Sequence, residues 1–302
     1  MEIFSIYIVL YHGKNFRLLT LLGKGEYMKK LILLLLFVST TAFAAEDNDL
    51  STLLMKATFR ISGSTSQGTC FVVGRPLSND TSRAAYVLVT ADHVLAGIPD
   101  ETATITLRKK VKDDYVKVQH SVRIRNSKKK PLWLKNPDAD VAVMYVSIPK
   151  EAEVVLLPMS FLATDERLNE LEIRPADRLL ALGFPLGQES NSAGFPILRS
   201  GIIAGYPILP TKKTKTMLFD FEVFQGNSGG PVFMIEKNRA YGGGIRIGVV
   251  QMIVGLVSQE RNLAVTTRTP FESKVQQHPL KLGVIIHASL IKETIEALPE
   301  PK

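Results

Sequence analysis

The stretch Gly226-Asn227-Ser228-Gly229-Gly230-Pro231 (GNSGGP) decides more about this chain than any other. It places a glycine-flanked serine directly after a strand-like run that ends at Phe224. Glycines adopt backbone angles that other residues avoid, so they allow backbone N–H groups to converge on one point and another chain to approach closely. A tight turn would not require this whole string. The pattern therefore favours a nucleophilic Ser228.

Two further motifs supply the partners that a serine nucleophile needs. Thr90-Ala91-Asp92-His93-Val94 follows a hydrophobic strand-like run, and Asp138-Ala139-Asp140-Val141 opens another. A serine hydroxyl becomes nucleophilic when an imidazole takes its proton, and a carboxylate must fix the tautomer of that imidazole. Each motif alone is weak evidence for a catalytic role. Together, in the order His, Asp, Ser, they predict a catalytic triad of His93, Asp140 and Ser228.

The strings TADHV (90–94), DVAVM (140–144) and GNSGGP (226–231) resemble the active-site motifs of the trypsin/chymotrypsin family, in its bacterial branch that includes the HtrA/Deg serine proteases. The resemblance implies that His93 acts as general base and then as acid, and that Asp140 orients it. It also implies an oxyanion hole formed by the N–H groups of Gly226 and Ser228. Asp138 is a rival for Asp140, but the family's acid directly precedes the apolar run, which favours Asp140.

The resemblance covers most of residues 55–298 and implies an all-β fold of two six-stranded antiparallel barrels with a C-terminal helix. The residues agree with it, because short β-branched runs form two groups and only the tail has clear helical spacing. We therefore expect a protease domain over 45–302 with these parts: N-terminal barrel about 55–148, C-terminal barrel about 177–287, terminal helix 288–298.

The N-terminal residues predict secretion. The basic Met28-Lys29-Lys30 precedes an unbroken apolar run, and Ala42-Phe43-Ala44 fits the small-x-small rule for signal-peptide cleavage. We expect a signal peptide over 28–44, cleavage after Ala44, and a secreted or periplasmic protein with no stable membrane anchor. Residues 1–27 do not fit such a signal, so we expect them to be an untranslated extension upstream of Met28.

The composition is that of a folded protein, with 302 residues, 45% hydrophobic and 22% charged. The formal net charge of +8 falls to about +5 once residues 1–44 are set aside, an excess too mild to indicate a nucleic-acid partner. The single cysteine, Cys70, lies in an apolar strand-like run, which favours a buried, inert thiol. No metal or other cofactor is expected.

Two interpretations of substrate preference stay open. If the register before Ser228 has no gap, Glu222 lies where the trypsin subset carries the acid that selects Lys or Arg. Alternatively, Glu222 is the exposed member of an alternating strand, and Val223 and Phe224 then suggest an apolar pocket. The resemblance further suggests that Gln251-Met252-Ile253 supplies the strand edge that pairs with substrate backbone.

The chain departs from the family in two respects. Asn227 stands where digestive members carry the aspartate that pairs with a new N-terminus after zymogen cleavage, so activation by that route is not expected. HtrA/Deg relatives carry a C-terminal PDZ domain, and we expect none after the terminal helix.

The predicted function is hydrolysis of polypeptide substrates by a serine endopeptidase; the oligomeric state is left open. The alternative is a catalytically silent or latent binding protein on a protease fold, which would not need the whole triad and its glycines. An esterase is disfavoured, because the candidate triad runs in the order His, Asp, Ser and not in the order Ser, Asp, His of the esterase fold.

Overall fold

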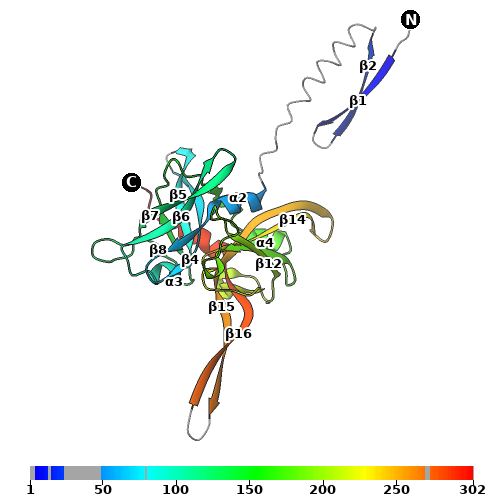
Figure 1. Ribbon diagram of the computed structural model, residues 1–302. Coiled ribbons are helices and arrows are strands. Elements are labelled where there is room, and N and C mark those ends of the chain that lie inside the picture. The colour runs from blue at the N-terminus through cyan, green and yellow to red at the C-terminus, as the bar shows by residue number, and fades with distance from the viewer. Residues whose placement is uncertain (1–3, 13–14, 24–48, 79, 269–272, 302) are drawn as a thin grey trace. The chain divides into compact units, whose positions relative to one another are not determined.

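Two β-sheets form the unit that runs from Asp49 to Lys302 (Figure 1). The structure is a computed structural model that describes residues 4–12, 15–23, 49–78, 80–268 and 273–301. A separate unit, Met1–Asn48, contains the antiparallel pair β1 (Phe4–His12) and β2 (Asn15–Gly23). The predicted signal peptide over 28–44 lies outside the described residues. Within the described ranges, no helix has the length and apolar character needed to cross a membrane.

The first sheet has the strand order β7-β6-β3-β4-β5-β9-β8, with β10 parallel to β4. Its strands are β3 (Thr58–Ser62), β4 (Gln67–Leu77), β5 (Asp80–Thr90), β6 (Thr102–Val111), β7 (Asp114–Arg123), β8 (Leu134–Lys135), β9 (Ala142–Tyr145) and β10 (Leu157–Pro158). Helix α2 (Leu50–Ala57) precedes the sheet and is capped by the Asp49 side chain, which accepts from the Ser51 N–H. Helix α3 (Asp92–Ala96) follows β5.

The second sheet has the order β12-β11-β14-β15-β16-β13. Its strands are β11 (Arg178–Gly183), β12 (Ile197–Ile202), β13 (Thr216–Asp220), β14 (Pro231–Tyr241), β15 (Arg246–Arg268) and β16 (Ser273–His287). The connections carry η1 (Met159–Phe161), α4 (Asp165–Glu170), η2 (Pro185–Gly187) and α5 (Thr211–Thr214). A bridge between Ile203 and Phe219 brings the two outer strands, β12 and β13, together, as a barrel requires.

Helix α6 (Ala288–Glu296) packs against strands of both sheets. Its buried residues Leu290, Ile291 and Ile295 are those whose spacing predicted the helix. Asn136 of the first sheet's connections is buried and donates to Thr294 Oγ1 at 2.8 Å. The predicted all-β fold with a C-terminal helix is thus confirmed.

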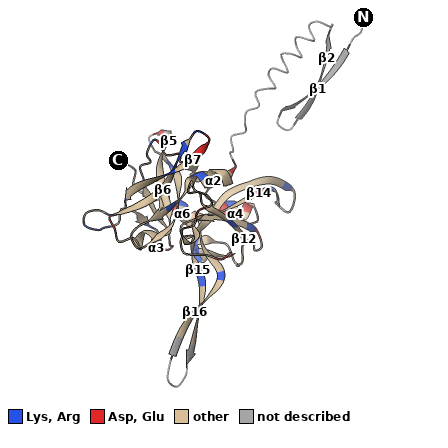
Figure 2. Cartoon of the chain, in the orientation of Figure 1, with Lys and Arg blue, Asp and Glu red and all other residues tan. Residues whose placement is uncertain are grey.

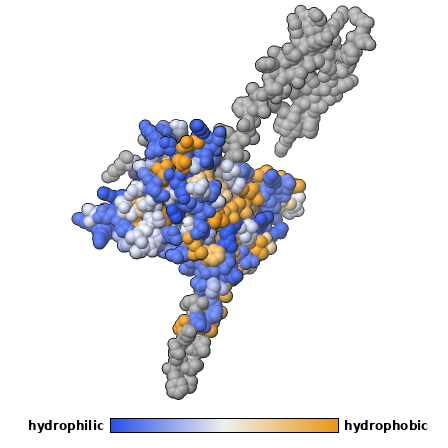
Figure 3. Space-filling model, viewed as in Figure 1, coloured by the Kyte–Doolittle hydropathy of each residue, from blue (hydrophilic) through white to orange (hydrophobic). Residues whose placement is uncertain are grey.

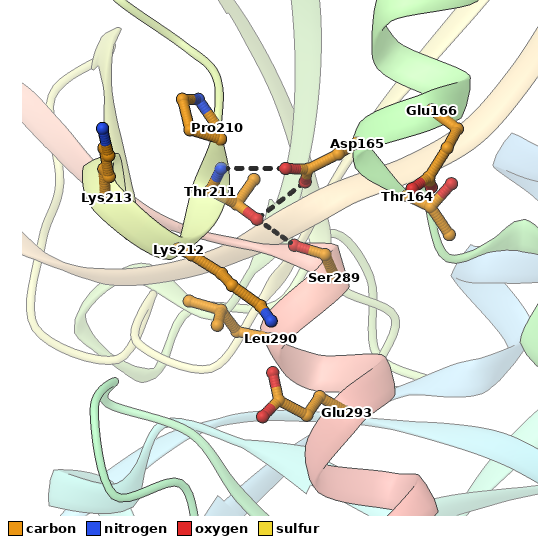
Figure 4. A pocket seen from close by; sticks show the side chains of 10 residues that line it. All are labelled: Thr164, Asp165, Glu166, Pro210, Thr211, Lys212, Lys213, Ser289, Leu290 and Glu293. Atoms are coloured by element: carbon orange, nitrogen blue, oxygen red, sulfur yellow. Dashed lines mark hydrogen bonds between the residues drawn. The ribbon is translucent and has the colours of Figure 1, made fainter.

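His287, the residue before α6, is a buried titratable group. It is fully buried, and neither ring nitrogen has a hydrogen-bond partner among the described residues. Burial lowers the pKa of His287 to about 4, although the nearby Asp165 carboxylate acts in the opposite direction. Asp165 itself lines a surface cavity of about 440 Å³ and accepts from the N–H and hydroxyl of Thr211 (Figure 4). The folded state therefore holds His287 neutral.

This burial predicts a loss of stability in mild acid. The unfolded chain protonates His287 below about pH 6.5, whereas the folded chain does so only near pH 4, so stability falls as pH drops between these values. The loss at pH 4 is about 3 kcal/mol. Urea unfolding at several pH values should show this dependence in the unaltered chain and in an exposed control, His278→Gln, and a much flatter one in His287→Leu. An equal slope in His287→Leu would contradict the prediction.

Candidate active site

His93 and Asp140 lie side by side because the strands that lead to them are paired. His93 belongs to α3, just after β5, and Asp140 lies just before β9; Thr90 of β5 pairs with Ala142 of β9. His93 Nδ1 lies 2.7 Å from Asp140 Oδ2, and the His93 backbone N–H donates to Asp140 Oδ1 at 3.0 Å. An N–H at Nδ1 leaves the lone pair on Nε2, which is the tautomer a general base requires.

The Asp140 carboxylate is stabilised in its charged form. Burial alone raises its pKa, but hydrogen bonds from His93 and Ser258 outweigh burial and lower the pKa to about 2. Asp138 has different surroundings, since its carboxylate is 63% exposed and pairs with Lys215 Nζ at 2.8 Å. Of the two acids, Asp140 contacts His93.

Ser258 connects Asp140 to Ser228, and the sequence analysis missed it. Its hydroxyl donates to Asp140 Oδ2 at 2.6 Å, and its carbonyl accepts from Ser228 Oγ at 2.7 Å. Ser258 occupies a β-bulge, because Val257 pairs with Ile285 and Gln259 pairs with Val284. Bulges re-aim side chains next to active sites. No motif marks a lone serine after an apolar strand, so only the fold reveals this role.

The Ser228 hydroxyl donates its hydrogen bond to the Ser258 carbonyl. Among the described residues, no hydrogen bond joins Ser228 Oγ to the His93 ring. A series of hydrogen bonds nevertheless connects the two residues, from Ser228 to the Ser258 carbonyl, from the Ser258 hydroxyl to Asp140, and between Asp140 and His93. Rotation of Ser228 about its Cα–Cβ bond releases the hydroxyl from Ser258.

The loop before Ser228 presents two backbone N–H groups. Asn227 N donates to Phe224 O at 3.0 Å and closes a turn in which Gly226 has φ +98°. That angle is the one a type II turn needs at its third residue, and a Cβ there would lie 2.2 Å from Phe184 O. Within the described part of the chain, neither the Gly226 N–H nor the Ser228 N–H donates to a protein acceptor. Both groups are available to an oxyanion.

Thr69, on β4 of the first sheet, forms hydrogen bonds with this loop. Its hydroxyl donates to Gly226 O at 2.7 Å and accepts from Phe184 N at 3.2 Å. Its backbone N–H donates to Ser228 O at 2.8 Å, and its carbonyl accepts from the Thr90 hydroxyl. The neighbouring Cys70 is fully buried, and burial raises the pKa of its thiol, so it contributes no nucleophile. The sequence analysis did not single out Thr69.

Glu222 precedes this loop with its carboxylate turned toward a basic residue. Its Oε1 lies 3.7 Å from Lys281 Nζ, and its backbone carbonyl accepts from Arg199 at 2.7 Å. Val223 is 6% exposed, whereas Glu222 and Phe224 are half-buried. The burial alternates as a strand-like stretch would, and the Arg199 guanidinium covers the Phe224 ring at 5.4 Å.

The structure does not bring Gln251-Met252-Ile253 to the other candidate residues. This stretch of β15 pairs with β14 along one edge, and Leu162 bridges to Ile253 on the other. Gln251 accepts from the N–H of Leu50 instead. The residue of β15 that contacts Asp140 and Ser228 is Ser258, further along the same strand. The assignment of Gln251-Met252-Ile253 to substrate binding stays a prediction.

Comparisons with known proteins give one family. The profile of the trypsin-like peptidase domain matches residues 64–242. No curated protein sequence matches the chain. Among solved structures, the inactive form of Rv3671c from M. tuberculosis H37Rv, a serine-to-alanine mutant, is 14% identical with a TM-score of 0.42, covering 83% of this chain and 90% of that one.

Two further solved structures are similar at the same level. The thermostable serine protease AL20, from an extremophilic microorganism, is 13% identical with a TM-score of 0.41, covering 80% of this chain and 95% of that one. The protease Anisep from Arthrobacter nicotinovorans is 12% identical with a TM-score of 0.43, covering 80% and 94%.

Proposed function

This chain belongs to the trypsin-like peptidase domain family, and we propose that it is a serine endopeptidase that cleaves polypeptides through His93, Asp140 and Ser228. The observation that carries the proposal is the hydrogen-bonded series from His93 through Asp140 and Ser258 to Ser228. Family membership supports a peptidase acting on polypeptide substrates. The series adds a candidate base, a half-buried carboxylate and a candidate nucleophile that are connected by hydrogen bonds.

The proposed reaction uses the groups in a fixed order. Ser228 Oγ leaves the Ser258 carbonyl, gives its proton to His93 Nε2, and attacks the carbonyl carbon of the scissile bond. The oxygen of that carbonyl becomes negative and accepts from the N–H groups of Gly226 and Ser228. His93 returns the proton to the leaving amine, and water then hydrolyses the acyl-enzyme by the reverse sequence. Asp140 stays charged throughout.

We also propose that the enzyme acts in the periplasm or outside the cell. The support is the basic, apolar and small-residue pattern of 28–44, with cleavage after Ala44. The motifs around His93, Asp140 and Ser228 support a bacterial protease related to the HtrA/Deg branch.

Labelling with a fluorophosphonate tests the function directly, because the reagent captures only an activated serine. We expect the purified protein to be labelled and to cleave an unstructured polypeptide, and both to disappear in Ser228→Ala. A folded protein that takes no label would overturn the proposal. It would favour a latent or silent binding protein, in which Ser228 stays on the Ser258 carbonyl.

For specificity, we propose an apolar pocket. The Glu222 carboxylate is turned toward the exposed Lys281, 3.7 Å away, which offsets part of its charge, and the adjacent Val223 is buried and apolar. We expect Glu222→Gln to change the ratio of kcat/KM for cleavage after Leu against cleavage after Arg by less than about threefold. Paired peptides that differ only at that position measure the ratio. A drop of about a hundredfold in cleavage after Arg would assign Glu222 the trypsin role instead.

A further inference from the structure

Strands β14 and β15 are joined at one end of the second sheet in a hairpin, residues 235–251 (Figure 1). One face of the hairpin is packed against the protein. Arg239 on that face is 5% exposed, and its guanidinium pairs with the Asp177 carboxylate at 2.7 Å. The Gly243 N–H in the turn donates to Glu172 Oε1 at 3.0 Å. These contacts fix which face of the hairpin is turned to solvent.

The outer face of the hairpin carries an apolar row, Ile245, Ile247 and Val249, that no described part of the chain covers. The three side chains alternate at the start of β15 and are 89%, 71% and 60% exposed. A Cβ added at Gly243 or Gly244 would contact no atom, so the turn beside the row lies in open space. Figure 3 shows apolar surface over this hairpin. Single exposed apolar residues are ordinary, but three on one face mark an interaction surface.

The apolar row leads to a surface cavity of about 490 Å³. Gln251 lines this cavity and lies two residues after Val249, so both side chains belong to the same face of β15. Ile235, the partner of Gln251 on β14, lines the cavity as well. Two basic residues, Arg178 and Lys237, complete this part of the lining, and both are exposed. The cavity therefore offers two cations beside an apolar surface.

The charge around the row and the cavity is positive. Between Lys237 and Gln251 the sequence contains no acidic residue, and Lys237 and Arg246 are both exposed. Figure 2 shows basic positions near the end of the hairpin. Asp49 also lines the cavity, but its carboxylate caps α2 and accepts from the Ser51 N–H at 2.8 Å. A partner that fits this surface presents apolar groups together with negative charge.

We propose that the apolar row and the cavity dock the protein on a bilayer that contains anionic phospholipids. The row enters the boundary between headgroups and acyl chains, and Arg178 and Lys237 bind a lipid phosphate. A second copy of the chain fits less well, because a stable interface buries about 800 Å² on each partner and three aliphatic side chains supply far less. The contact is peripheral and reversible. It does not depend on the proposed peptidase function.

A fluorophore placed in the row tests the proposal. Ile247→Cys introduces the only accessible thiol, because Cys70, the single cysteine of the sequence, is buried. An NBD group on that thiol brightens and shifts to the blue when it leaves water. We expect this change with vesicles of phosphatidylcholine that contain about one third phosphatidylglycerol. The same probe on Val116→Cys, an exposed apolar position of β7, should not respond. An unresponsive probe at position 247 would overturn the inference.

Sedimentation with the same vesicles measures the affinity of the full chain. Serine at all three positions of the row should weaken binding at least about tenfold, and Lys237→Gln about fivefold. The matched control replaces Leu263 and Val265, an exposed apolar pair further along β15, with serine and should change binding less than about twofold. Every variant keeps residues 28–44, so their contribution is the same throughout.

Equal vesicle binding by the row variant and the original chain would overturn the inference. A dimer that is lost in the row variant while vesicle binding is unchanged would also overturn it, and would assign the row to a second copy of the chain.

Discussion

Replacing Ser228 with alanine should lower kcat for peptide cleavage by about 10⁵–10⁶-fold, since the variant has no nucleophile and retains only the oxyanion donors and substrate binding. The free energy of unfolding should change little. Ser228 Oγ donates one hydrogen bond, to the Ser258 carbonyl, and its loss costs about 1 kcal/mol. The measurement pairs burst kinetics on an ester substrate with thermal unfolding, so that a loss of activity is separated from a loss of structure.

The control for Ser228→Ala is Cys70→Ala. Cys70 is the single cysteine of the sequence, and its thiol is fully buried in β4. Its replacement should leave burst kinetics unchanged. Residual activity of Ser228→Ala above about one hundredth of the original would show that another group supplies the nucleophile.

Replacing Asp140 with asparagine should lower kcat by about 10⁴-fold, because the amide no longer accepts the Nδ1 proton of His93 and the imidazole adopts the wrong tautomer. Asp138→Asn is a matched control two residues away. Asp138 makes an exposed ion pair with Lys215, so its replacement should change kcat by less than about twofold. Equal losses in both variants would contradict the assignment of Asp140.

Replacing Asp140 with asparagine should also change how the stability of the folded chain depends on pH. The pKa of Asp140 falls from 3.8 to about 2 on folding, so the carboxylate stabilises the folded chain above about pH 4 and this contribution disappears as pH falls toward 2. The contribution is about 2 kcal/mol. Urea unfolding should therefore show a gap between the original chain and Asp140→Asn at pH 6 that narrows below pH 4.

The sequence by itself determined the local chemistry. GNSGGP, TADHV and DVAVM are each contiguous, so the residue types and the glycine backbone angles they need can be read without knowing the fold. The short β-branched runs in two groups likewise predicted the all-β class, and the helical spacing of the tail predicted α6. Strand lengths were less predictable. Taken as a sequence, residues 245–257 and 263–267 are two strand-like runs with polar residues between them. Pairing with β16 instead makes β15 one strand from Arg246 to Arg268.

Only the tertiary structure decided which distant residues serve these motifs. Ser258 donates a hydrogen bond to Asp140, which is 118 residues away along the chain. Thr69 donates one to Gly226, which is 157 residues away. A single serine or threonine carries no local pattern, and its role comes from the bulge or strand pairing that aims it. The same holds for the length of β15. Hydrogen bonds between strands depend on register, and register is set by packing of whole sheets rather than by the residues of one strand.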